Sequence, residues 1–129
     1  MANVSVGLTG EKRLSVTPDI AVDFLGHEGA RVLGTPFMIM LIEMTARDSI
    51  LPLLDPGYDS VGTEVCIRHL AATPLGMDVV FKTEVIEAAD RRVKFKVEAF
   101  DAKEQIADGT HERFIINVER FAKRLAEKI

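Results

Sequence analysis

The chain contains very little cysteine, no tryptophan and no long hydrophobic run. Cys66 is its only cysteine among 129 residues, so it can form no intrachain disulfide, and it offers too few thiolates for a structural zinc site. The first ten residues lack a basic start followed by an apolar stretch, and no run approaches the roughly 20 apolar residues that span a bilayer. These absences predict a cytoplasmic, soluble protein in a reducing compartment, with no bound metal and no membrane partner.

The charge balance argues against nucleic acid as a partner. Sixteen Lys and Arg face twenty Asp and Glu, which leaves a net charge of -4, whereas a general nucleic-acid binder normally carries a basic face. The glycines form neither a dinucleotide fingerprint nor a Walker-type motif. With 129 residues, of which 47% are hydrophobic, residues 1–129 are predicted to form a single domain around one core.

One long helix dominates the first half of the sequence. Lys12–Val16 is expected to form a short strand, and Thr17-Pro18 opens a brief helix. The segment Pro36–Leu53, dense in Met, Ile and Leu, predicts a long and largely buried helix with Thr35 as its N-cap.

After residue 60 the hydrophobic period changes from helical to two. In Val61–His69, Val65 and His69 are predicted to share one face, with Cys66 on the other as a small buried hydrophobe. The later pattern predicts an antiparallel meander and an amphipathic tail helix. These elements are Val79–Ile86, Val93–Ala99, Gln105–Val118 and, for the helix, Glu119–Ile129. A helix apolar on most sides needs a sheet around it, so the fold class is α+β.

Three local motifs carry a family resemblance. Thr35 is followed by Glu43 eight residues later, Gly62-Thr63 opens the strand that reaches His69, and Gly109-Thr110-His111-Glu112-Arg113 forms one run. Over nearly its whole length the chain resembles the fluoroacetyl-CoA thioesterase-like family of hot-dog proteins. The resemblance implies an antiparallel sheet wrapped around a long central helix, and a homodimer or dimer of dimers with active sites at the subunit interface.

The resemblance also implies roles for six residues. Thr35, Glu43 and His69 would be catalytic, and the substrate-binding residues would be Gly62, His111 and Arg113. Thioester hydrolysis needs a nucleophile or activated water, a proton shuttle and a donor to the carbonyl oxygen, and these residue types supply them. Glu43 either attacks the thioester or activates water, and the sequence leaves both routes open.

Each of these residues also has a structural interpretation. Thr35 before Pro36 is what a simple helix N-cap gives, and a lone His69 on an apolar face is typical of a hydrogen-bonded core residue. Glu43 has Arg47 four residues later, which fits an ion pair on the helix surface, although its apolar neighbours indicate burial.

For His111 and Arg113, a polar strand face or an ion pair with Glu112 or Glu98 explains the residue types equally well.

The implied reaction is hydrolysis of a small or medium acyl-CoA to a carboxylate and free CoA, with the CoA thioester as substrate and no cofactor. One departure concerns specificity: the fluoroacetyl-specific enzyme carries a phenylalanine-bearing lid, whereas Ala21–Gly34 is short and holds only Phe24. This difference argues against fluoroacetyl specificity and leaves the acyl group open. The alternatives are a non-catalytic acyl-CoA-binding hot-dog module and a hot-dog hydratase or dehydratase.

Overall fold

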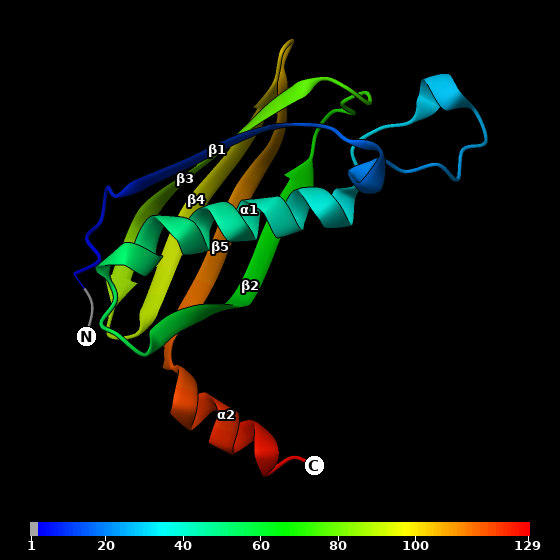
Figure 1. The fold of residues 1–129 in the computed structure, drawn as a ribbon. Helices are drawn as coiled ribbons and strands as arrows, with labels where there is room; N and C mark the ends of the chain where they lie inside the picture. Colours follow the sequence, from blue (N-terminus) through cyan, green and yellow to red (C-terminus); the bar gives the residue numbers. More distant parts are fainter. Residues whose placement is uncertain (1–2) are drawn as a thin grey trace.

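A computed structural model describes residues 3–129, and in it one five-stranded antiparallel sheet curves around a central helix (Figure 1). The α+β fold class is therefore confirmed. The strands are β1 (Thr9–Ser15), β2 (Tyr58–His69), β3 (Asp78–Ala89), β4 (Arg92–Asp101) and β5 (Gln105–Asn117). The helices are α1 (Thr35–Ile50) and α2 (Val118–Ala126), with short 3-10 turns at Pro18–Ile20, Glu28–Ala30 and Leu51–Leu53.

The strand order in the sheet is β1-β3-β4-β5-β2. Consecutive strands β3, β4 and β5 form the predicted meander, while β2 joins at the far edge beside β5. In the β4–β5 turn the carboxylate of Asp101 accepts hydrogen bonds from the backbone N–H groups of Lys103 (2.8 Å) and Glu104 (3.0 Å). The order leaves β2 with one side unpaired.

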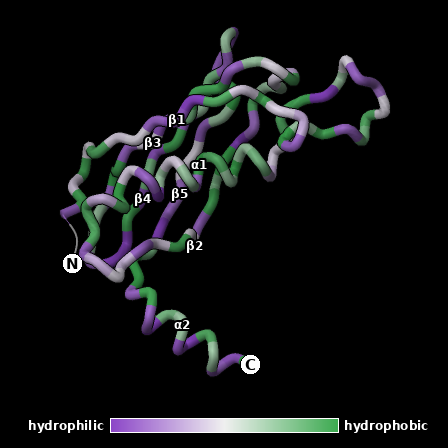
Figure 2. The backbone as a smooth tube through the Cα atoms, viewed as in Figure 1, coloured by the Kyte–Doolittle hydropathy of each residue, from purple (hydrophilic) through white to green (hydrophobic). Residues whose placement is uncertain are grey.

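The core lies between α1 and the inner face of the sheet. Strands alternate between hydrophobic and hydrophilic residues in Figure 2, and the inward set of β3 and β4, including Phe81 and Phe95, is fully buried against Met38 and Ile42 of α1. Each such side chain contributes about 1.5–3 kcal/mol through removal of its apolar surface from water.

Helix α1 differs from its prediction in two ways. It begins with Gly34 as N-cap, so Thr35 is its first helical residue and makes no capping hydrogen bond. The helix is also not buried nearly all round, because Phe37, Met40 and Met44 are 38%, 49% and 36% exposed. These three residues, spaced by three and four, form an apolar stripe on one open side of the helix.

A bulge between Gly62 and Glu64 divides β2 into two halves. Val65 pairs with buried His111 on the inner face, as predicted, but Val61 pairs with Phe114 on the outer face. The prediction that one face runs unbroken along this strand was therefore wrong, because the extra residue of a bulge reverses the alternation. Cys66 was expected to be buried and is exposed.

Helix α2 projects from the end of β5, away from the sheet (Figure 1). The Asn117 side chain caps it by accepting a hydrogen bond from the Arg120 N–H at 3.0 Å. The predicted tail helix is confirmed, although it ends at Ala126 rather than at the last residue. No helix within residues 3–129 is long and apolar enough to cross a membrane.

Candidate active site

The three residues predicted to be catalytic fall into two groups along α1. Thr35 lies in the first turn and Glu43 eight residues later, a rise of about 12 Å along the helix axis. His69, at the end of β2, is next to Thr35. Within one chain, the structure thus brings Thr35 and His69 together and sets Glu43 apart from them.

Thr35 and His69 form what we call the helix-start pair. The Thr35 hydroxyl and His69 Nδ1 lie 2.8 Å apart in a hydrogen bond. His69 Nε2 is buried and has no hydrogen-bond partner within residues 3–129. Burial holds the pKa of His69 below its usual value, outweighing an opposing backbone interaction with Ala71. The imidazole is therefore neutral near pH 7, with one nitrogen free for a reacting group.

An open pocket of about 470 Å³ surrounds the helix-start pair. Besides Thr35 and His69, its walls are mainly aliphatic and aromatic. They include Val22, Phe24, Leu25, Val32, Leu33, Leu70, Ala71 and Ala72. Because Phe24 and Leu25 are 79% and 57% exposed, the segment that carries them adds apolar surface at the mouth of the pocket. A pocket of this composition accepts an uncharged, apolar group.

Glu43 belongs to a second group, the carboxylate cluster, with His111 and Arg113. Glu43 Oε2 lies 3.6 Å from Arg113 NH1 and 3.9 Å from His111 Nε2. The alternative of an ion pair with Arg47 is not realised, because Arg47 forms a two-pronged ion pair with Asp59 at 2.6 and 2.9 Å. Burial of Glu43 was also expected, but its side chain is 34% exposed.

Arg113 and His111 are fixed by a hydrogen-bond chain. Arg113 donates to the hydroxyl and to the carbonyl of Ser60, both at 2.7 Å, and its NH1 lies 3.2 Å from His111 Nε2. His111 Nδ1 lies 2.8 Å from the Glu64 carbonyl. Since a guanidinium can only donate and a carbonyl can only accept, His111 carries its proton on Nδ1.

The ion pairs considered for Arg113 with Glu112 or Glu98 are not formed. Glu112 instead contacts Thr63 and Arg92. Ser60, which anchors Arg113, was missed from the sequence. Its position two residues before Gly62 on the inner face of β2 is the signal that could have indicated it.

Burial dominates the electrostatics of the carboxylate cluster. His111 is completely buried, stacks on Phe95 with ring centroids 6.2 Å apart, and has a pKa lowered chiefly by desolvation. Desolvation likewise lowers the pKa of Arg113, and the nearby Glu43 carboxylate opposes this shift. The cluster thus pairs a neutral imidazole and a cation with one half-exposed carboxylate.

Gly62 leaves room for that carboxylate. A Cβ at this position would lie 2.4 Å from Glu43 Oε2 and 3.2 Å from the His111 ring. Any larger residue must therefore displace the Glu43 side chain. No group of three metal-ligating side chains is present within residues 3–129. The chemistry available here is that of a carboxylate, a hydroxyl and a neutral imidazole.

Comparison with known proteins identifies close relatives. A family model described as "FlK: Fluoroacetyl-CoA-specific thioesterase" matches residues 16–119. The fluoroacetyl-CoA thioesterase of Streptantibioticus cattleyicolor is 38% identical over 101 residues, which cover 78% of this chain and 73% of that enzyme.

Solved structures share the fold. A structure of the fluoroacetyl-CoA thioesterase FlK superposes with a TM-score of 0.89 at 33% identity, covering 98% of each chain. Variants of that enzyme have been solved with fluoroacetate and CoA and with acetyl-CoA. A thioesterase superfamily member from Thermus thermophilus gives a TM-score of 0.85 at 30% identity, over 99% of this chain and 97% of the other.

Proposed function

The chain belongs to the fluoroacetyl-CoA-specific thioesterase family and is an acyl-CoA thioesterase, and we propose that it hydrolyses a small or medium apolar acyl-CoA to a carboxylate and free CoA. The substrate proposal is based mainly on the apolar pocket that Thr35 and neutral His69 line. A thioester carbonyl seated at the mouth of this pocket would have its acyl chain among apolar walls and its sulfur toward solvent.

The residues divide the reaction between them. The Glu43 carboxylate either attacks the thioester carbon, forming an anhydride that water then opens, or takes a proton from the water that attacks. Neutral His69 acts as a proton relay, accepting at Nε2 the proton that water releases on attack and passing it to the departing thiolate, while the Thr35 hydroxyl holds the imidazole by its Nδ1. Arg113 keeps the Glu43 carboxylate oriented beside Gly62.

The acyl selectivity we propose rests on the pocket wall. Phe24 and Leu25 at the mouth and Leu70 beside His69 offer apolar contact but no polar group that would recognise a fluorine or a charge. The free energy gained by burying the acyl chain increases with chain length until the pocket is full. We therefore place the preferred substrate among unsubstituted short and medium chains rather than at fluoroacetyl.

A second copy of the chain would complete the site. Phe37, Met40 and Met44 on α1 and Val65 on β2 expose apolar surface next to an unpaired strand edge, a combination that favours self-association. Two copies related by a two-fold axis perpendicular to this edge have antiparallel β2 strands, which carries the helix-start pair of one toward the carboxylate cluster of the other. We propose a homodimer whose sites use Glu43 from one subunit and His69 from its partner.

The first test is thiol release, read with a chromogenic disulfide, over acyl-CoAs from acetyl to long-chain and including fluoroacetyl. We expect a maximum at a short or medium unsubstituted chain and loss of turnover in folded Glu43→Gln and His69→Ala. Saturable binding without thiol release from any ester would instead support a non-catalytic acyl-CoA-binding module. An altered double bond without free thiol would indicate a hydratase.

The second test mixes subunits. If each site takes Glu43 and His69 from different subunits, one heterodimer of Glu43→Gln with His69→Ala contains one intact site. Unfolding and refolding an equal mixture of the two inactive variants should then recover about a quarter of wild-type activity. Recovery of none, with heterodimers demonstrated by mass, would place the whole site within one chain.

A further inference from the structure

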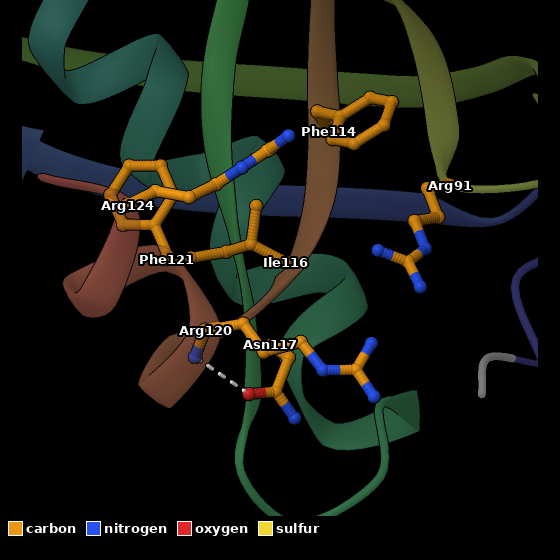
Figure 3. Close-up of a pocket in the computed structure, with 7 residues that line it drawn as sticks. All are labelled: Arg91, Phe114, Ile116, Asn117, Arg120, Phe121 and Arg124. Carbon is orange, nitrogen blue, oxygen red and sulfur yellow. Dashed lines mark hydrogen bonds between the residues drawn. The ribbon is translucent and has the colours of Figure 1, made fainter. Parts of the chain in front are cut away.

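A basic pocket lies on the outer face of the sheet, opposite α1. Three arginines, Arg91, Arg120 and Arg124, surround a cavity of about 350 Å³ whose apolar walls include Phe114 and Phe121 (Figure 3). In Figure 3 the guanidinium group of Arg91 points in from one side, and that of Arg124 approaches the Phe114 ring from the other. We call this feature the arginine pocket.

Three fixed elements build the arginine pocket. The tight β3–β4 turn, with Asp90 in the left-handed region at φ 56°, presents Arg91, whose carbonyl accepts a hydrogen bond from the Ile115 N–H at 2.7 Å. Strand β5 contributes Phe114, and the cap on Asn117 sets the start of α2. The pocket is therefore preformed rather than assembled from mobile side chains alone.

The charge in this pocket is uncompensated. Within residues 3–129 no carboxylate pairs with Arg91, Arg120 or Arg124, although the chain as a whole is acidic. Arg120 and Arg124 are four residues apart on α2, a spacing at which like charges destabilise a helix. A site that concentrates cations around exposed aromatic rings is suited to a ligand with several negative charges and a flat ring system.

We propose that the arginine pocket binds the phosphorylated adenine nucleotide of the CoA thioester, an assignment that rests on the proposed function. CoA ends in an adenosine that carries a 3′-phosphate and a 5′-diphosphate. The guanidinium groups pair with these phosphates, and the adenine ring stacks on Phe114, which is 39% exposed, or on Phe121. The pocket supplies affinity for the invariant end of the substrate and leaves acyl selection to the other pocket.

The arginine pocket and the carboxylate cluster lie on opposite faces of the same strand. Phe114 of the arginine pocket directly follows Arg113 of the carboxylate cluster on β5, with the two side chains on opposite faces. Only β2 lies between β5 and the edge of the sheet, and neighbouring strands are about 4.8 Å apart. In the proposed dimer that edge lies between the two subunits, and the flexible pantetheine arm of CoA passes between them near Gly62, where the β2–β5 register shifts.

The test compares a CoA thioester with the matching pantetheine thioester, which has the same acyl group but no nucleotide. In Arg120→Ala/Arg124→Ala we expect KM for the CoA ester to rise about tenfold or more, with kcat unchanged. KM for the pantetheine ester should not move. Adenosine 3′,5′-bisphosphate should inhibit the wild type competitively, and inhibition should weaken in the variant and at high salt.

The matched control is Lys123→Ala/Lys128→Ala, which removes the same charge from α2 and the residues that follow it without touching the arginine pocket. Equal KM increases in both double variants would overturn the proposal in favour of a general charge effect. It would also be overturned by a KM increase shared by the pantetheine ester, or by inorganic phosphate inhibiting as well as the bisphosphate does.

A failure of the proposed function would give different experimental results from a failure of the pocket assignment. If wild-type protein cleaves neither ester, the thioesterase proposal fails, and calorimetric titration with adenosine 3′,5′-bisphosphate still tests the arginine pocket. Binding by the wild type and not by Arg120→Ala/Arg124→Ala would support a nucleotide site by itself. If both esters are cleaved and the variant matches the wild type on each, only the pocket assignment is wrong.

Discussion

The helix-start pair and the carboxylate cluster share one helix but are built in opposite ways. Thr35 and His69 make one hydrogen bond to each other, beside an open apolar pocket, and leave His69 Nε2 without a partner. In the cluster, Arg113 makes three polar contacts besides Glu43, and His111 uses both ring nitrogens.

In the proposed mechanism, this contrast separates His69, which takes part in the reaction, from Arg113 and His111, which support Glu43. A buried polar atom without a partner costs free energy, so its retention at His69 indicates a group kept for a ligand. Fully satisfied networks instead add rigidity, and here the network holds one carboxylate in place. Substitutions of Arg113 and His111 should therefore reduce stability, while those at the helix-start pair and at Glu43 should reduce turnover alone.

The largest effect is expected for Arg113→Met. It leaves the Ser60 hydroxyl and carbonyl and the Glu43 carboxylate without their donor, so the free energy of unfolding should fall by about 2–4 kcal/mol. Urea unfolding followed by circular dichroism measures this. Arg92→Met, which removes a largely exposed arginine from the neighbouring strand, is the control and should cost well under about 1 kcal/mol.

His69→Ala should give the next largest effect, on catalysis. Loss of the proton donor should lower kcat about 100-fold, while the free energy of unfolding stays within about 1 kcal/mol of wild type. Steady-state kinetics and urea unfolding on the same preparation provide both values. A variant that unfolds as easily as Arg113→Met would erase the distinction between the two groups.

Gly62→Ala tests the carboxylate cluster by displacing the Glu43 side chain. The added methyl group would lie 2.4 Å from Glu43 Oε2, and because a carboxylate can swing away, the fold should survive while the nucleophile or base is misplaced. We expect kcat to fall about tenfold, with KM nearly constant. Gly76→Ala, at a turn with open space but φ 91°, should instead affect stability alone.

The smallest effect concerns pH. Burial lowers the folded-state pKa of both His69 and His111, so the unfolded chain binds protons more readily than the folded one once the pH falls below about 6.5. Stability should be fully present above that pH and decrease as the pH falls toward the folded pKa values. Thermal unfolding between pH 5 and 8 measures the slope, which should be shallower in His111→Asn.

The sequence predicted the positions of the strands better than it predicted which of their residues are buried. Period-two alternation placed β3, β4 and β5 correctly because the inner face of these strands packs into the core against α1 while the outer face is more exposed. The alternation failed in β2, because the bulge at Gly62 exchanges the inner and outer faces of the strand and no nearby residue pattern indicates a bulge. Cys66 points away from the side of Val65 and His69, as predicted, but it was expected to be buried and is exposed, because it lies on the outer face of an edge strand.

The candidate site was predictable as a set of residues but not as a geometry. The eight-residue spacing of Thr35 and Glu43 indicates two positions on one helix, yet which of them meets His69 depends on how β2 packs beside α1. Likewise Arg47, four residues after Glu43, was the natural local partner, and Asp59 from β2 takes it instead. Long-range pairing decides both cases.

The segment 22–32 that carries Phe24 and Leu25 has ends that meet. Ala21 bridges to Leu33, and the Val22 N–H donates to the Val32 carbonyl at 2.8 Å, so the segment leaves and re-enters the fold at one place. Such a closed loop can be exchanged as a unit, in evolution or in the laboratory, without altering the strands or α1. Replacing this one short loop would therefore change the apolar surface at the mouth of the pocket, while the strands and α1 that carry the candidate site stay unchanged.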